Sequence, residues 1–212
     1  LEGKSVGTVA AGRIGQRVLR RLKPFDVDLH YTDYQRLSGD EERSLGVTYH
    51  ESVEAMLPHC DVVTINCPLH PGTEHLFNEA MISKMKPGSF LVNTARGKIV
   101  DAEALVRAVE SGHIAGYAGD VWFPQPAPRN HPWRLMPRHA MTPHYSGTTL
   151  DAQARYAAGT KEILANFFDS KPQRPDYLIL DQGKMVTRSY SEGGTTSGSD
   201  KVQSRATVLS SS

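Results

Sequence analysis

The sequence predicts an α/β fold with a doubly wound parallel sheet, and two observations lead to that prediction. Short apolar runs rich in Val, Ile, Leu and Thr alternate with segments of helical periodicity over the first 149 residues. The segments between these runs are long enough to cross over the sheet as helices of about ten residues. Strands separated in this way imply right-handed βαβ units, which build a parallel sheet with helices on both faces.

Each predicted strand is a short run dominated by apolar and β-branched residues, and seven runs meet that description. The clearest are DVVTIN and SFLVNT, because they are the most continuously apolar. In chain order the predicted strands are residues 5–9, 27–31, 46–50, 61–66, 89–94, 115–121 and 140–142.

The predicted helices lie between these strands and after the last of them. Asp101 stands at the N-cap of the segment 101–110, and Glu103 in its first turn complements the helix dipole. Residues 150–168 form one long amphipathic segment with an apolar packing face. The other predicted helices are RVLRRL, SVEAMLPHC and NEAMISKM.

Length and composition set loose bounds on the protein. Its 212 residues allow one large domain or one domain with appendages. A net charge of +1 gives no reason to expect a nucleic acid or a membrane surface as partner. No apolar run approaches the roughly 20 residues that cross a bilayer. Cys60 and Cys67 form no disulfide or metal pattern, so we expect a reducing, cytoplasmic location and no metal.

The chain is expected to divide into three parts. Residues 1–149 form the dinucleotide-binding domain, residues 150–185 a C-terminal helix and a segment that would pack on a further domain, and residues 186–212 a flexible tail rich in Ser, Gly and Thr. The first residue is Leu1 and not Met, so we expect a piece of a longer chain in which organellar targeting cannot be read.

A glycine turn near the amino end predicts a dinucleotide site. Gly12 would let the backbone approach a pyrophosphate at a helix N-terminus, and Gly15 would allow close packing of helix and strand. Ala10 replaces the first glycine of the usual fingerprint. Asp33 ends the second strand 18 residues after Gly15, near the spacing at which a carboxylate binds the adenosine ribose and disfavours NADP. The alternative is that Asp33 serves only in a turn.

Polar residues follow several later strands, and the carboxyl ends of parallel strands share one crevice. Arg96 follows the run 89–94, and its fork of donors matches a carboxylate; a salt bridge to a helix is the alternative. Asp120 could bond the nicotinamide amide or ribose, or cap a turn. Gln125 and His144 lie on the loops after the last two strands. Pro68 lies in a loop that is either part of the site or an ordinary turn.

Longer segments resemble a known family. AAGRIG with YTD, NCPLHPGTEH, VNTARG, GYAGDVWFPQPAP and MTPHYSGTTLDAQARYAAGT together are similar to the NAD-dependent, metal-free formate dehydrogenases of the D-2-hydroxyacid dehydrogenase superfamily, over residues 1–190. The resemblance implies a Rossmann-type domain, NAD as cofactor, formate as substrate and a homodimer. It also implies that Arg96 holds formate, that His144 is the active-site histidine and that Gln125 is hydrogen-bonded to it. The cofactor-binding positions then are Ala10, Gly12, Arg13, Ile14, Gly15, Asp33, Pro68, Thr94, Asp120, Ser146 and Gly147.

The amide of Gln125 favours formate over a 2-hydroxy acid. Enzymes that oxidise hydroxy acids must remove a hydroxyl proton, and a carboxylate usually supports the histidine that takes it. Formate loses only a hydride, so a neutral amide that orients the imidazole is sufficient. Two alternatives stay open: a glycerate- or lactate-type dehydrogenase, and a non-catalytic NAD-binding or dimerisation module. In the family a preceding domain closes over formate, so we expect this chain to be weak or inactive alone.

Overall fold

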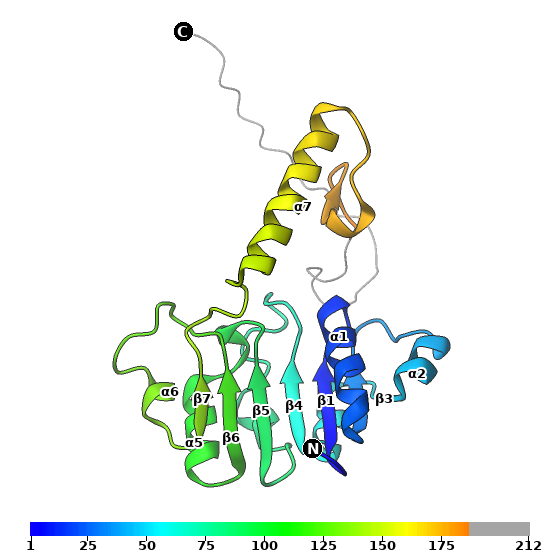
Figure 1. Ribbon diagram of the computed structural model, residues 1–212. Coiled ribbons are helices and arrows are strands. Elements are labelled where there is room, and N and C mark those ends of the chain that lie inside the picture. The colour runs from blue at the N-terminus through cyan, green and yellow to red at the C-terminus, as the bar shows by residue number, and fades with distance from the viewer. Residues whose placement is uncertain (187–212) are drawn as a thin grey trace.

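The computed structural model describes residues 1–186, and these fold into a parallel α/β sheet followed by a projecting helix (Figure 1). The sheet contains seven strands in the order β3-β2-β1-β4-β5-β6-β7, and every adjacent pair is parallel. Their bounds are β1 Ser5–Val9, β2 Asp28–Thr32, β3 Val47–Tyr49, β4 Val62–Ile65, β5 Ser89–Asn93, β6 Ile114–Gly119 and β7 His139–Met141. All seven predicted strands are therefore present, each within two residues of its predicted ends.

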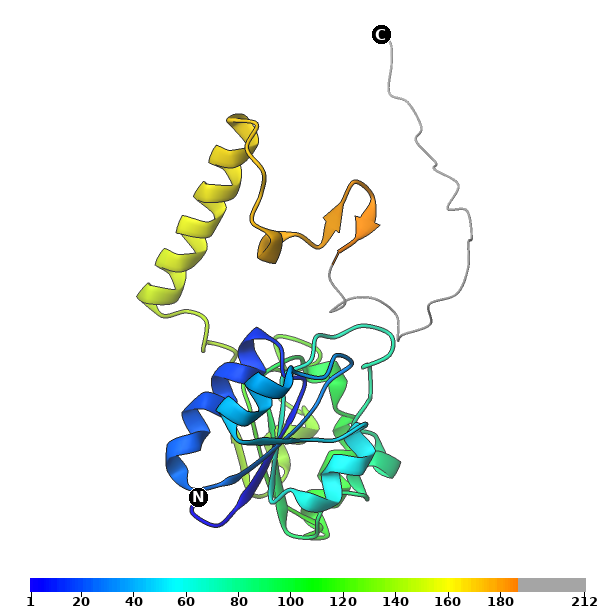
Figure 2. The same ribbon diagram turned by 90° about the vertical axis from the view of Figure 1, so that its right-hand side faces the viewer.

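The helices cover both faces of the sheet (Figure 2). They are α1 Arg13–Leu22, α2 Gly39–Leu45, α3 Val53–Met56, α4 Glu79–Ile82, α5 Ala102–Glu110, α6 Pro132–Leu135 and α7 Leu150–Phe168. Short 3₁₀ turns, η1 Lys23–Phe25, η2 Leu57–His59, η3 Gly97–Ile99 and η4 Pro175–Tyr177, extend or join them. A small hairpin, β8 Leu180–Asp181 with β9 Lys184–Met185, follows α7.

Several crossovers are shorter than the ten-residue helices that the sequence predicted. The segments 52–60 and 78–85 contain four-residue α-helices, capped by the side chains of Ser52 and Asn78. Helix α5 begins after its predicted cap, where the Asp101 side chain accepts a hydrogen bond from the Ala104 amide. Helix α2 was not predicted, although Ser38 and Glu41 form a complete capping box at its start.

Two apolar clusters hold the sheet and its helices together. Val6, Leu19, Leu29 and Leu45 belong to the cluster that packs α1 and α2 against β1 and β2. The larger cluster lies on the other face, under α3, α4, α5 and α6, and includes Met56, Ile82, Leu91, Leu105 and Trp133. Apolar burial stabilises the folded state by roughly 25 cal/mol per Å², so these two clusters contribute to holding the helices on the sheet.

Helix α7 stands apart from the sheet (Figures 1 and 2). It begins with a capped turn, in which the Thr149 side chain accepts from the Ala152 amide, but none of its residues is buried. Its predicted packing face is exposed within residues 1–186: Tyr156 is 70% and Phe167 70% accessible. The packing of residues 150–185 on a further domain stays a prediction, and the predicted tail beyond Val186 lies outside the described residues.

Candidate functional site

The predicted site residues all lie at the carboxyl edge of the sheet, on the loops that follow its strands or, for Arg13, Ile14 and Gly15, in the first turn of α1. The chain leaves β1 toward one side of the sheet and β4 toward the other, so the edge between these strands is a topological switch point, where open α/β sheets bind ligands. Ala10 to Gly15 follow β1, Asp33 follows β2 and Pro68 follows β4. Thr94 and Arg96 follow β5, Asp120 and Gln125 follow β6, and His144, Ser146 and Gly147 follow β7.

The glycine turn after β1 is tightly built. Gly12 is the N-cap of α1, and no side chain caps that helix end. A Cβ on Gly15 would lie 2.2 Å from the carbonyl oxygen of Ala10, so only glycine fits there. Ala10 itself has a φ of 74°, in the left-handed region that glycine adopts without cost. The turn thus keeps the backbone path of the glycine fingerprint although its first glycine is replaced.

Asp33 is bound to the same turn. One oxygen of its carboxylate, Oδ2, accepts a hydrogen bond of 2.7 Å from the Ala11 amide, and Oδ1 accepts one of 3.1 Å from the Gln35 amide. The ends of β1 and β2 are therefore joined at the point where a dinucleotide would present its ribose. These two bonds give Asp33 the turn role that was the alternative, and its binding of the ribose stays a prediction.

The loop after β4 contains a buried histidine that the sequence analysis did not select. His70 Nδ1 accepts a hydrogen bond of 3.1 Å from the Gly72 amide, so Nε2 carries the ring hydrogen. Nε2 is buried and has no partner among the described residues. Its ring centroid lies 6.3 Å from that of Tyr34, next to Asp33. Cys67 is buried, and burial raises the pKa of its thiol to about 11, which fits a packing role and not a nucleophile.

Asn93 shapes the loop that carries Arg96. Its side-chain amide donates to the Arg96 carbonyl over 2.9 Å, and its Oδ1 accepts from the Ala95 amide over 3.0 Å. Asn93 has no exposed surface, so these bonds fix the exit from β5. Arg96 is itself exposed, and one of its guanidinium nitrogens, Nη1, donates to the Ala95 carbonyl over 2.6 Å.

The Arg96 loop packs directly against the loop that carries Gln125. A Cβ on Gly97 would lie 2.4 Å from the carbonyl carbon of Trp122, so the two backbones are in close contact. His131 supports the second loop from below: its Nε2 donates to the Phe123 carbonyl over 3.0 Å, while Nδ1 accepts from the Trp133 amide over 3.2 Å. Both nitrogens of His131 are thus used structurally.

Gln125 and His144 meet at the end of the site. The oxygen Oε1 of Gln125 lies 2.9 Å from Nδ1 of His144. An amide oxygen can only accept, so His144 carries its hydrogen on Nδ1 in this arrangement and presents Nε2 away from the pair. A pocket of about 460 Å³ lies beside Gln125 and is lined by Trp122, Arg134 and Met141 among others.

The side chain of Asp120 connects the end of β6 to the loop of His144. The Asp120 carboxylate is 5% exposed and accepts hydrogen bonds from Thr142, His144, Tyr145 and Ser146. Sequence reasoning selected Asp120 but missed Thr142, Asn93, Gly97, His70 and His131. Asn93 could have been selected from the sequence because it is an amide residue at the end of an apolar strand. At that position its side chain can form hydrogen bonds with the loop that follows.

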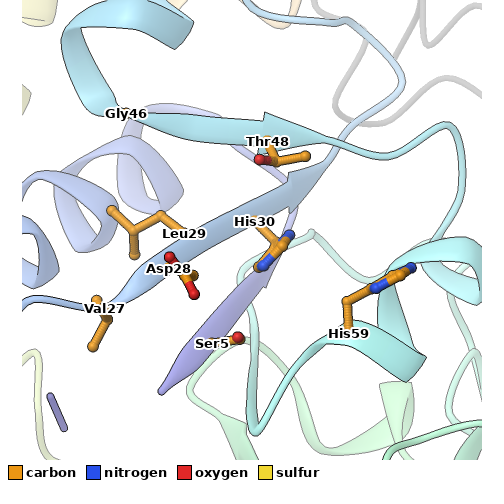
Figure 3. A pocket seen from close by; sticks show the side chains of 8 residues that line it. All are labelled: Ser5, Val27, Asp28, Leu29, His30, Gly46, Thr48 and His59. Carbon is orange, nitrogen blue, oxygen red and sulfur yellow. The ribbon is translucent and has the colours of Figure 1, made fainter. Parts of the chain in front are cut away.

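A separate pocket of about 330 Å³ lies near the amino ends of β1, β2 and β3, away from this site (Figure 3). His30 and His59 line it, and His30 Nδ1 lies 3.0 Å from Nε2 of His50. The ring centroids are 5.1 Å apart for His30 and His50, and 5.2 Å for His50 and His59. No group of three or more His, Cys, Asp or Glu side chains within residues 1–186 is arranged to hold a metal ion.

His30 and His50 lead us to predict that the protein loses stability in mild acid. Burial, and then the neighbouring imidazoles, lower the pKa values of His30 and His50 from the ordinary value of 6.5, whereas Asp28 opposes the shift at His30. The unfolded chain therefore takes up protons below about pH 6.5 before the folded state does, and stability falls as pH decreases through that range. We expect the Tm to be lower at pH 5.5 than at pH 7.5, by roughly 2–4 °C for each kcal/mol lost.

Calorimetry of a variant tests the assignment. His50→Gln should reduce the difference in Tm between the two pH values, whereas His139→Gln, at an exposed histidine on β7, should leave it unchanged. An equal difference in both variants would show that other groups cause the acid response.

Comparisons with known proteins agree with this geometry. The family model of the D-isomer specific 2-hydroxyacid dehydrogenase NAD binding domain matches residues 1–146. The chain is 60% identical over 205 residues to a formate dehydrogenase of Pseudomonas sp. (strain 101), covering 95% of this chain and 51% of that protein. It is 57% identical over 199 residues to one from Neurospora crassa, covering 91% of this chain and 53% of that protein.

Solved structures give the same result. A formate dehydrogenase described as Granulicella M. has a TM-score of 0.82 at 62% identity, over 87% of this chain and 49% of that one. An NAD-dependent formate dehydrogenase from Staphylococcus aureus, in complex with NAD, has a TM-score of 0.73 at 49% identity, over 82% of this chain and 51% of that one. The chain thus spans about half the length of the relatives it matches. Since the family model covers well over half of its residues, the protein belongs to the D-isomer specific 2-hydroxyacid dehydrogenase family and contains its NAD-binding domain.

Proposed function

We propose that this chain supplies the NAD-binding site and part of the formate-binding site of an NAD-dependent formate dehydrogenase. The reaction is formate + NAD⁺ → CO₂ + NADH, with direct transfer of hydride. The observation that carries the proposal is the hydrogen bond between Gln125 and His144, which pairs the imidazole with a neutral amide. The high identity to formate dehydrogenases from several organisms supports it.

The residues at the switch point fit NAD. A Cβ placed on Gly12 meets nothing within 4 Å, so the turn leaves free space in front of the α1 N-terminus, where a pyrophosphate would sit. The buried Nε2–H of His70, which lacks a partner among the described residues, would donate to an acceptor near the ribose end. When bound, NAD⁺ supplies the hydride acceptor. The positions expected to contact it remain those selected from the sequence.

Arg96 would bind the formate carboxylate. Its guanidinium carries five donors in a planar fork, and within residues 1–186 its described hydrogen bond uses Nη1. The remaining donors are available to two carboxylate oxygens. The Asn93 contacts fix the backbone of Arg96, so the anion would be held in one place.

His144 would face the substrate from the other side of the site without removing a proton. Its Nδ1–H is engaged by Gln125, which leaves Nε2 to face the substrate. No proton leaves formate when its C–H bond breaks, so the reaction needs positioning and a complementary electrostatic environment more than a base. A hydroxy acid would need a base, and the neutral amide does not add the negative charge that supports one.

The proposal also covers the oligomeric state and the cellular location of the protein. We propose a homodimer in the cytoplasm, with residues 150–185 packing on a further domain. The exposed apolar side chains of α7, such as Leu150 and Phe168, support packing against another surface. Among the described residues, no helix is long and apolar enough to cross a membrane.

The function is tested by following NADH formation from formate and NAD⁺ with this chain and with a full-length version that restores the other half found in the relatives. We expect turnover by the full-length version and little or none by this chain, which should still bind NAD. Equal turnover by both would contradict the division of the site. No turnover of formate by either, with turnover of glycerate or lactate, would favour a hydroxyacid dehydrogenase.

Gln125→Glu separates the two enzyme classes. A carboxylate beside His144 should lower kcat/KM for formate by about tenfold or more, because it places a negative charge near the substrate anion. It should also permit measurable oxidation of a 2-hydroxy acid. Gln182→Glu, at the exposed turn of the β8–β9 hairpin, adds the same charge outside the loops that carry the site and should change neither activity.

A further inference from the structure

The carboxylate of Asp120 binds almost entirely to the loop that carries His144. Oδ1 accepts hydrogen bonds from Thr142 Oγ1 at 2.5 Å, from the His144 amide at 3.0 Å and from the Tyr145 amide at 3.2 Å. Oδ2 accepts from the Ser146 amide at 3.1 Å and from Ser146 Oγ at 2.5 Å. All five donors belong to residues 142–146, while Asp120 follows a different strand more than twenty positions earlier.

These five bonds use the full acceptor capacity of the carboxylate, whose two oxygens offer about four lone-pair sites. Burial alone would raise the pKa of Asp120, but the hydrogen bonds from Ser146 and Thr142 outweigh it and hold the pKa well below its usual range. Asp120 is therefore ionised at neutral pH, where both of its oxygens can accept hydrogen bonds.

His144 needs such support because of its backbone. Its φ is 66°, in the left-handed region that non-glycine residues occupy only when the surroundings over-determine them. Three consecutive amides, those of His144, Tyr145 and Ser146, point at the two oxygens of Asp120. This arrangement sets the direction in which the His144 side chain leaves the backbone, and so its contact with Gln125.

We propose that Asp120 is a positioning residue that fixes the loop 142–146 and thereby places His144 and Ser146 in the active site. This role rests on the proposed function. A contact between Asp120 and the nicotinamide end of NAD, which the sequence indicated, would have to share oxygens that already bind this loop, so it would not replace this role.

Asp120→Asn tests the proposal in the free protein. Asparagine keeps the shape but replaces one acceptor with an NH₂ group, which must face either the amides of His144 and Tyr145 or that of Ser146. The hydroxyls of Thr142 and Ser146 can rotate, but backbone N–H groups cannot reverse. In NMR spectra of ¹⁵N-labelled histidine side chains, we expect Asp120→Asn to shift the His144 signals. Gln125→Ala should also shift these signals in the unchanged protein, but it should have no further effect when Asp120→Asn is already present.

Asp101→Asn is the matched control. It removes a carboxylate that accepts from a backbone amide at the start of α5, where asparagine caps equally well. Its His144 signals should be those of the unchanged protein. Unchanged His144 signals in Asp120→Asn as well would overturn the proposal. If Asp120→Asn does not fold, Thr142→Val, which removes one donor and keeps the shape, should move the same signals less far in the same direction.

A second measurement separates positioning from direct contact with the cofactor. A carboxylate can only accept, so a contact with the nicotinamide amide would use the carboxamide N–H groups of NAD, which 3-acetylpyridine adenine dinucleotide lacks. Positioning predicts that Asp120→Asn raises the Kd of both dinucleotides, on the order of tenfold. A loss for NAD with the analogue unaffected would overturn the proposal. If the unchanged protein bound neither dinucleotide, the proposed function would fail, while the NMR result would still decide the role of Asp120.

Discussion

Replacing Arg96 with glutamine is expected to lower kcat/KM for formate by a factor of about 10² to 10⁴. Each charged hydrogen bond that is lost costs about 1.5–3 kcal/mol, and a bidentate carboxylate loses two of them. Glutamine cannot restore the fork or the charge. The Kd of NAD should stay within about twofold, because Arg96 lies after β5 while the glycine turn and Asp33 lie after β1 and β2.

Steady-state kinetics on the full-length version, with NAD binding measured by NADH fluorescence, check this result. Arg96→Lys keeps the charge but not the fork, so its kcat/KM for formate should lie between those of the unchanged enzyme and of Arg96→Gln. Arg107→Gln is the control: it removes an exposed arginine on α5 that pairs with Glu79, and neither activity nor cofactor binding should change. An Arg96→Gln enzyme with normal kcat/KM would place the substrate elsewhere.

Alanine substitutions at two glycines of the turn after β1 are expected to affect different properties. Gly15→Ala should lower stability, and Gly12→Ala should weaken NAD binding. In Gly15→Ala the new Cβ would lie 2.2 Å from the Ala10 carbonyl oxygen, which is backbone and cannot turn aside. We expect a loss of about 2–3 kcal/mol in stability and a fall in Tm of roughly 5–10 °C. In Gly12→Ala the Cβ meets no protein atom within 4 Å, and its φ of −68° suits any residue.

Gly12→Ala should therefore keep its Tm within about 2 °C and yet bind NAD on the order of tenfold more weakly, because the Cβ occupies the space of a pyrophosphate. Thermal unfolding of both variants and NAD titration of Gly12→Ala check these three expected values. Normal NAD affinity in Gly12→Ala would contradict the prediction that the pyrophosphate binds at this turn. Normal stability in Gly15→Ala would show that the helix start can move away from β1.

The strands could be predicted from the sequence, whereas helix lengths could not. The central strands β1 and β4 are short runs of mostly apolar residues, and such a run is a local signal that burial on both faces reinforces. The helix expected over residues 78–85 is four residues long because Asn78 caps it and the chain then turns toward β5. Helix α2 is polar on its surface, so periodicity missed it, although its capping box at Ser38 and Glu41 could be read from the chain.

For the site, the sequence predicted which loops meet but not how they are held. Arg96, Asp120 and His144 could be placed at one edge because strand ends converge in any parallel sheet. The tight contact of Gly97 with Trp122 could not be read, because it depends on how two loops of adjacent strands pack. The two structural bonds of His131 were equally hidden, since a histidine in a sequence does not reveal its partners.

The sequence by itself determined the parallel α/β fold, the glycine turn with its acidic partner, and the neutral amide that favours formate. These follow from residue type and spacing, which are local properties of the chain. Only the tertiary structure decided that the Asp120 carboxylate accepts hydrogen bonds from the loop of His144, and that His144 has a left-handed backbone conformation there. Both depend on hydrogen bonds between segments more than twenty residues apart, and such bonds exist only once the strands have been brought side by side.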